Sequence, residues 1–264
     1  MAEIIRLHPS VKERKNPRLS AAALAEYLIM RPDQQETLLH NCKFASPPVV
    51  TPHSAALSPI RAYCADPRRP ISILEAAIQV LQGKSQDDSI TPKGREESLR
   101  CIETIKLFMN AENGLGIRSL RLEECDRMPM MQIEGVEISV QPDLFVQSGS
   151  AKQRERCGLI FFRPQKAPDP AASRLEETKR AKGDHRREMA RYILALGQTM
   201  AEATFSEGRI FDRDSSFVAD IRIGERIAFS SQDHASRMRA VQAACRQISK
   251  LWSMIEPRQA IMVK

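Results

Sequence analysis

Two neighbouring stretches of the sequence read EGVEISVQPDLFV (residues 134–146) and GLIFFR (residues 158–163). Alternating and continuous apolar residues of this kind predict adjoining β-strands in a covered sheet. One carboxylate, Asp143, stands between apolar neighbours at the start of the second predicted strand. Because a charged group in such a place is costly unless it is paired or binds a metal ion, the functional question begins at Asp143.

The composition is typical of a soluble globular protein. The 264 residues are 42% hydrophobic, with a mean hydropathy of −0.37, and can bury one sizeable core. The apolar runs fall far short of the roughly 20 residues that a membrane span needs. The N-terminal sequence has no basic region followed by a long apolar stretch, so we expect no secretory signal and a cytoplasmic location.

The cysteines do not have the spacing of metal ligands. There are six, with no C-x-x-C pair, and we expect them to act as small apolar groups. No phosphate-binding loop is present, and no serine, cysteine or lysine lies in the sequence context of an activated nucleophile.

The N-terminal half predicts helices. Ser20 is the expected N-cap of a helix to about Met30, and a second helix follows from Pro32. Ser72 and Glu75 form a capping box for a helix that should end at Gly83. The remaining predicted segments are a loop over 46–52, a helix over 54–64, a polar linker over 83–95 and a helix over 98–110.

Strands dominate the pattern after residue 128. The segment 128–140 predicts one or two strands with a turn near Glu134-Gly135, and 144–146 and 159–162 predict further strands. A long Pro-rich, charged loop is expected over 163–183, followed by a helix over 185–205. The segment 216–229 predicts a hairpin that turns at Gly224-Glu225, with Asp220 on its exposed face, and 234–255 predicts the last helix.

This order predicts an α/β (α+β) fold, with a central mixed β-sheet flanked by helices and preceded by an N-terminal helical region. The expected organisation is a flexible basic arm over 1–18, a helical region over 19–97 and the α/β domain over 98–264.

Gln141-Pro142-Asp143 at the start of a strand, together with this element order, resembles the PD-(D/E)XK superfamily of restriction-type endonucleases. The resemblance implies a restriction-endonuclease-like sheet in which Asp143 is the first metal-binding aspartate. It also implies Mg²⁺, a glutamate on the preceding helix, for which Glu103 is the candidate, and a (D/E)-x-K motif on the next strand.

The chain departs from this pattern at the third element. No acidic residue occurs in residues 158–166, and Gln165 and Lys166 are the nearest substitutes for the missing motif. An amide does not supply the anionic field that a divalent ion needs, so the resemblance implies a degenerate active site. Asp143 also fits a turn residue or an ion-pair partner, and Glu103 also fits a surface pair with Lys106.

The net charge of +7 and the isoelectric point near 9.2 favour a polyanionic partner. Basic residues gather over 12–18 and again over 179–187, where a solvated charged loop is the alternative reading. The expected phosphate contacts of the second cluster are Lys179, Arg180, Lys182, Arg186, Arg187 and Arg191.

The leading functional hypothesis is a bacterial-type nucleic-acid-binding protein on a degenerate nuclease-like scaffold, acting in a DNA- or RNA-processing or defence assembly. The first alternative is an active Mg²⁺-dependent nuclease that uses Asp143 and Glu103, with Gln165 and Lys166 as an aberrant third element. The second alternative is a protein-interaction subunit that docks a partner through its N-terminal helical region and binds no nucleic acid.

Overall fold

The computed structural model describes residues 6–45, 52–151, 154–205, 208–230 and 233–263. The chain divides into two compact units. Unit 1 comprises residues 1–49, 128–140 and 232–264, and unit 2 comprises residues 50–127 and 141–231. Each unit therefore combines segments that are separated in the sequence.

Unit 1 combines three helices with short strand pairs. Its helices are α1 (Ala21–Ile29), α2 (Pro32–Lys43) and α7 (His234–Trp252). β3 (Arg18–Ser20) runs parallel to β7 (Val136–Ser139), and β7 pairs antiparallel with β6 (Met131–Ile133). Two further antiparallel pairs are β1 (Arg6–Leu7) with β13 (Met262–Val263) and β2 (Lys12–Glu13) with β4 (Phe44–Ala45).

Local sequence explains the ends and faces of these helices. The Ser20 hydroxyl caps α1 by accepting from the Ala23 N–H at 3.1 Å, and Pro32 occupies the first turn of α2, where its missing N–H costs nothing. The buried positions of α7 recur at helical spacing, which gives the helix one apolar stripe; they are Val241, Ala244, Cys245, Ile248 and Trp252.

Unit 2 is built on a mixed sheet. Its strand order is β12 (Glu225–Ala228), β11 (Phe217–Asp220), β9 (Arg154–Arg163), β8 (Leu144–Ala151) and β5 (Arg121–Glu124), and β10 (Arg209–Phe211) also pairs with β9. β9 runs antiparallel to β8 and parallel to β11, and the connection from β9 to β11 passes through α6 (Glu176–Thr204).

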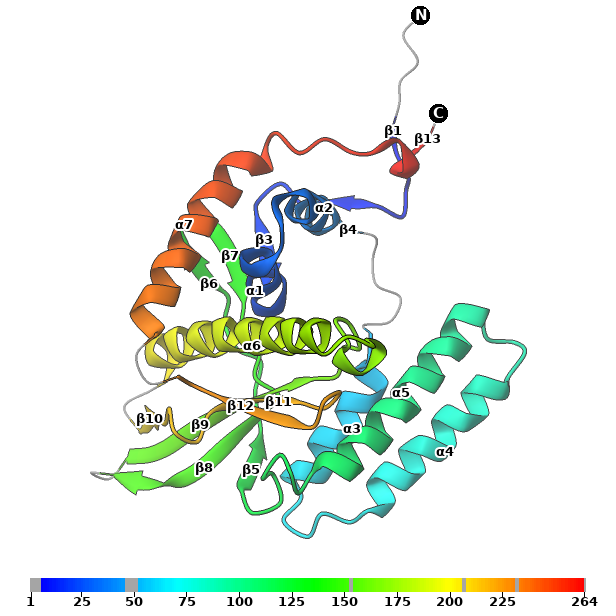
Figure 1. Ribbon diagram of the computed structural model, residues 1–264, viewed down its shortest axis with the longest axis vertical. Helices are drawn as coiled ribbons and strands as arrows, with labels where there is room; N and C mark the ends of the chain where they lie inside the picture. Colours follow the sequence, from blue (N-terminus) through cyan, green and yellow to red (C-terminus); the bar gives the residue numbers. More distant parts are fainter. Residues whose placement is uncertain (1–5, 46–51, 152–153, 206–207, 231–232, 264) are drawn as a thin grey trace, which may run out of the picture. The chain divides into compact units, whose positions relative to one another are not determined.

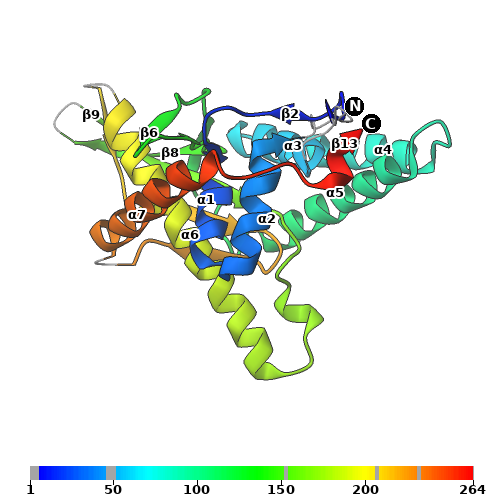
Figure 2. The ribbon, with the colours of Figure 1, turned by 90° about the horizontal axis from the view of Figure 1, so that it is seen from above.

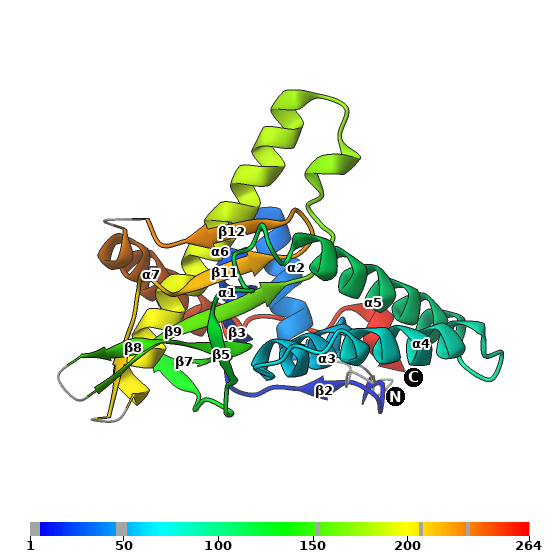
Figure 3. The ribbon, with the colours of Figure 1, turned by 90° about the horizontal axis from the view of Figure 1, so that it is seen from below.

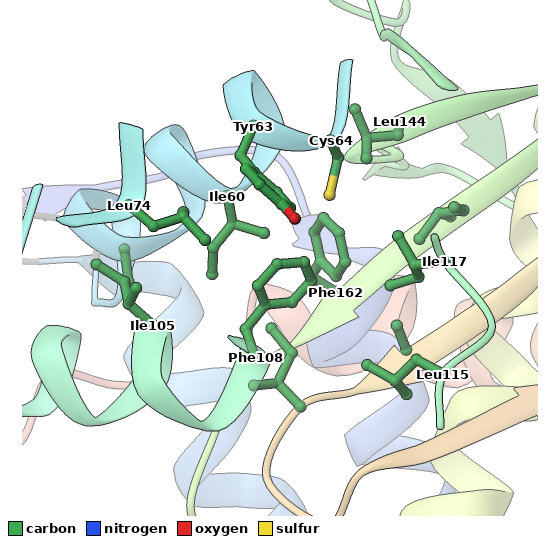
Figure 4. Close-up of a cluster of buried hydrophobic side chains, with 14 of the residues drawn as sticks. Ile60, Tyr63, Cys64, Leu74, Ile105, Phe108, Leu115, Ile117, Leu144 and Phe162 are labelled. Carbon is green, nitrogen blue, oxygen red and sulfur yellow. The ribbon is translucent and has the colours of Figure 1, made fainter. Parts of the chain in front are cut away.

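Helices cover both faces of this sheet. On one face (Figure 3), α3 (Ser54–Ala65), α4 (Ser72–Gln86) and α5 (Pro92–Ala111) pack against side chains that include Ile160 and Phe162 of β9. Figure 4 shows this core, where Phe162 lies edge-on to Phe108 of α5 with the ring centroids 5.8 Å apart. α6 crosses the other face (Figure 1), and Gly197 of this helix lies so close to Phe161 that an added Cβ would approach the ring to 2.9 Å.

The predicted mixed α/β class, with a sheet flanked by helices, is confirmed. The hairpin over 131–139 is also confirmed, and Glu134 and Gly135 at its turn have φ angles of 49° and 81°. The hairpin nevertheless belongs to unit 1, because β7 pairs with β3, whereas Asp143 and β8 belong to unit 2.

The expected division into 1–18, 19–97 and 98–264 does not coincide with the two units. The segment predicted as a flexible arm contains β1 and β2 and leads into β3, so its described part pairs with distant parts of the chain. The helices α3, α4 and α5 share one apolar core with β8 and β9, which places them in unit 2. The sequence predictions missed these pairings because strands of two or three residues have no periodic signal of their own.

Three predicted helix boundaries were wrong. α4 continues past Gly83 to Gln86, and Ser72 is its first helical residue and not a cap. α5 begins at Pro92, where the Thr91 hydroxyl accepts from the Gly94 N–H at 3.2 Å. α6 begins at Glu176, nine residues before the expected start, because pairs such as Lys179–Glu176 support its first turns. The predicted loop over 46–52 lies almost wholly outside the described residues.

Candidate functional site

Asp143 is fixed to the neighbouring strand at the start of β8. Its backbone N–H donates to the Ile160 carbonyl at 2.8 Å, and its Oδ2 accepts from the Phe162 N–H at 2.7 Å. Both partners lie on β9, so the carboxylate extends the hydrogen bonding between the two strands beyond the first regular pair, Leu144 with Ile160. This geometry follows from the sequence, because Pro142 has no N–H to donate and Asp143 can accept through its side chain.

The carboxylate is largely buried and lies near one cation. The Asp143 side chain is 13% exposed, and its Oδ1 lies 3.6 Å from Nη1 of Arg61, a partly exposed residue of α3. Burial raises the pKa of Asp143 to about 6, while the Phe162 N–H and the Arg61 charge act in the opposite direction. Desolvation therefore outweighs the two favourable contacts, and ionised Asp143 is held at a cost in free energy.

Glu103 belongs to a different cluster. Its carboxylate accepts a hydrogen bond from Arg222, whose guanidinium also donates to Asp169 Oδ2 at 2.9 and 3.1 Å. Asp169 is buried and lies in the loop before α6, and Arg222 follows β11. No contact joins Glu103 to Asp143 among the described residues, so the predicted pair of metal ligands is not assembled, and the surface pair with Lys106 is not formed.

The side chains of Gln165 and Lys166 face solvent. Their backbone carbonyls accept hydrogen bonds from Arg186, at 2.9 Å for Gln165 and 3.3 Å for Lys166. The two residues therefore help to anchor the loop after β9 and do not approach the Asp143 carboxylate. The cation on β9 nearest to them, Arg163, is buried and donates to the Arg186 carbonyl at 3.0 Å.

Arg186 is the most completely engaged side chain of the site region. It is fully buried, and its Nε and Nη2 donate to the two oxygens of Asp220 at 2.7 and 2.6 Å. Its other three N–H groups reach the carbonyls of Gln165, Lys166 and Pro168. All five donors are used, so Arg186 has none left for a phosphate. The expectation that Asp220 faces solvent was wrong, because this buried guanidinium neutralises it.

The other cations predicted to contact phosphate lie on α6, mostly paired with acids. The ion pairs are Lys179–Glu176, Arg180–Asp184, Arg187–Glu225 and Arg191–Glu188. Lys182 donates to the Asp169 carbonyl at 3.2 Å and to the Ser173 hydroxyl at 2.6 Å. The charge of this helix surface is therefore largely compensated, although Arg180 remains highly exposed.

These residues do not fit a magnesium site. Mg²⁺ requires several oxygen ligands in octahedral geometry, whereas Asp143 offers one carboxylate that already accepts an N–H and faces a guanidinium. Within the described residues, no group of three or more His, Cys, Asp or Glu side chains is placed to hold a metal ion. The arrangement instead satisfies the carboxylate with Arg61, in a position where a dication would be repelled by that guanidinium.

No helix among the described residues combines the length and apolarity that crossing a membrane requires. Comparison with known proteins finds no family model that matches the chain and no curated protein that matches its sequence.

Proposed function

We propose that this chain is a non-catalytic nucleic-acid-binding protein built on a PD-(D/E)XK nuclease-like scaffold. The topology of unit 2 supports the scaffold: a helix precedes an antiparallel set of strands, and α6 then leads to the parallel strand β11. Asp143 lies at the start of β8, beside the strand where the resemblance implies the (D/E)-x-K motif. The single observation that carries the loss of catalysis is the contact between Asp143 and Arg61.

Phosphodiester hydrolysis is expected to be absent. Purified protein incubated with plasmid DNA or with RNA in the presence of Mg²⁺ or Mn²⁺ should cut neither substrate faster than the Asp143→Asn variant does, because no described group of carboxylates holds the ion. Gel electrophoresis of the substrates measures this directly. Metal-dependent cutting by the wild type that disappears in Asp143→Asn would establish the active-nuclease alternative.

The basic segment before α1 supports nucleic-acid binding more strongly than α6 does. The side chains of Lys12, Lys15 and Arg18 are exposed, and no carboxylate of the described residues pairs with them. Their backbone is ordered, because β2 pairs with β4 and β3 pairs with β7. Cations that are exposed, unpaired and held on a fixed backbone can displace the counterions of a phosphate chain without first breaking ion pairs.

Salt-dependent binding separates the two basic surfaces. The triple variant Lys12→Gln, Lys15→Gln, Arg18→Gln should bind a short duplex or single strand more weakly, with the slope of log K against log salt reduced by about 2–3. Fluorescence anisotropy of a labelled oligonucleotide, measured over a series of salt concentrations, provides both the affinity and the slope.

The matched control removes the same charge from α6. Lys179→Gln, Arg180→Gln, Arg191→Gln should change the slope less, because each of these cations already has an acidic partner. A larger loss in this control would move the binding surface to α6, as the sequence alone predicted. Absence of binding to both DNA and RNA at low salt would overturn the proposal and favour the protein-interaction subunit.

A further inference from the structure

Unit 1 contains a cavity of about 510 Å³ that no part of the proposed function uses. Residues of α1, α2, α7 and the segment after α7 line it, and Figures 1 and 2 show these three helices side by side. Its apolar lining includes Leu39, Leu251 and Ile255. The volume falls within the range of small-molecule sites, and such sites are largely apolar with a few polar groups that fix the orientation of the ligand.

One polar group in the lining lacks a partner. Tyr27 is 2% exposed, and its hydroxyl makes no hydrogen bond to the described residues. Its backbone carbonyl, by contrast, accepts from the Gln35 side chain at 2.8 Å. Burial raises the pKa of Tyr27, so the hydroxyl stays protonated and can both donate and accept. The hydroxyl oxygen is not one of the fully buried unpartnered atoms of the described residues, so it stays accessible and is available to a polar group of a ligand.

The exposed part of the lining carries an excess of negative charge. Glu36 and Glu256 are exposed, and neither forms an ion pair with a described residue. The cation beside them, Arg258, donates to the Thr37 hydroxyl at 2.9 Å through its guanidinium. The backbone N–H of Arg258 donates to His40 Nε2 at 3.2 Å, so that ring nitrogen is engaged as an acceptor. Two carboxylates against one guanidinium leave the mouth of the cavity complementary to a cation.

We propose that this cavity binds a small aromatic amine. The aromatic body lies against Leu39, Leu251 and Ile255, and a polar substituent at its buried end meets the Tyr27 hydroxyl. The ammonium group lies at the mouth, near the carboxylates of Glu36 and Glu256. None of the lining residues belongs to the basic segment 12–18, and Asp143 is not among them, so this proposal does not depend on nucleic-acid binding.

The single tryptophan of the chain provides the readout. Trp252 is buried at the end of α7, directly after the lining residue Leu251, and its Nε1 donates to the Arg14 carbonyl at 3.0 Å. Tyramine, which carries a phenol at one end and an ammonium at the other, should change the emission of Trp252 saturably when the full chain is excited at the red edge of its absorption. The matched anion 4-hydroxyphenylacetate should bind at least about five-fold more weakly, because it meets Glu36 and Glu256 with the wrong sign.

Three variants assign the contacts. Tyr27→Phe removes one hydrogen bond and should weaken tyramine binding about five-fold, with little change for phenethylamine, which lacks the phenol hydroxyl. The double variant Glu36→Gln, Glu256→Gln should reduce the preference for tyramine over the anion. Glu177→Gln, at an exposed carboxylate of α6 that pairs with no cation of the described residues and belongs to unit 2, should leave binding unchanged. No saturable change with tyramine, equal affinity for the two probes, or equal affinity of all variants would each overturn the proposal.

Discussion

Arg186→Met is expected to lower the free energy of unfolding by about 3–5 kcal/mol, the cost of breaking a buried ion pair from one side. In the native structure the guanidinium is fully buried and is bonded to both oxygens of Asp220. Methionine fills a similar volume but leaves the Asp220 carboxylate buried with no counter-charge. Chemical denaturation followed by circular dichroism measures the loss.

The neighbouring arginine is a matched control. Arg187→Met removes the same group from the same helix, but Arg187 is 39% exposed and its partner Glu225 is 32% exposed. Water screens this pair, so the expected loss is at most about 1 kcal/mol. Equal losses in the two variants would contradict the account of Arg186 as a buried anchor.

A double-mutant cycle tests the pairing itself. Arg186→Met combined with Asp220→Leu should cost clearly less than the sum of the two single losses, because the second change removes the uncompensated charge. The combined variant should still be less stable than the wild type, since the carbonyls of Gln165, Lys166 and Pro168 lose their donor. Additive losses would mean that the two side chains act independently.

Asp143→Asn is expected to stabilise the protein at neutral pH, by up to about 3 kcal/mol. Burial raises the pKa of this carboxyl from its ordinary 3.8 to about 6, and each pKa unit corresponds to about 1.4 kcal/mol. Asparagine keeps an oxygen that can accept from the Phe162 N–H and has no charge to desolvate. The half-exposed Arg61 loses a partner but remains accessible to water.

The sign of this effect depends on pH. Between about pH 4 and pH 6 the native protein holds a proton on Asp143 that the unfolded chain has released, so the wild type loses stability as the pH rises through this window. The difference between Asp143→Asn and the wild type should therefore be small near pH 4, grow up to about pH 6 and stay constant above it. A difference that is already full at pH 4, or that has the opposite sign at pH 7, would contradict the account.

Asp212 provides a matched control, because its substitution by asparagine should change the stability in the opposite direction. Burial alone would raise its pKa, but hydrogen bonds from Ser148, Ser215 and Arg156 outweigh this, and the net pKa is lowered. The ionised carboxylate of Asp212 therefore stabilises the native state above its unfolded pKa, and that contribution is lost as the pH falls through the folded pKa. Asp212→Asn should accordingly destabilise the protein at pH 7, where Asp143→Asn stabilises it.

The sequence predicted what local patterns encode. Ser20 caps α1, the turn at Glu134-Gly135 closes a hairpin, and the apolar run before Arg163 forms a strand that is covered on both faces. Each of these features depends on residues within a few positions of one another. Asp143 was singled out for the same reason, since its apolar neighbours are adjacent to it in the sequence.

The remainder of the site depends on contacts between distant segments. Arg61 meets Asp143 across more than eighty residues of sequence, and Arg222 joins Glu103 to Asp169 from a third segment. Periodicity places Arg61 at the edge of a buried stripe but does not indicate which strand that helix will cover. The same limit explains the wrong prediction for Asp220. Strict alternation predicted an exposed side chain, but helices cover both faces of the sheet, so Asp220 is buried.

The central claim is that Asp143 is an acid buried against a guanidinium and not a metal ligand. Carbon-13 NMR of the labelled Asp143 carboxyl, titrated with and without an excess of Mg²⁺, tests it most directly. The account predicts a midpoint near pH 6 that Mg²⁺ does not move and a resonance that Mn²⁺ does not broaden. A midpoint that falls well below 6 on addition of Mg²⁺, with broadening by Mn²⁺, would contradict it and restore the metal site.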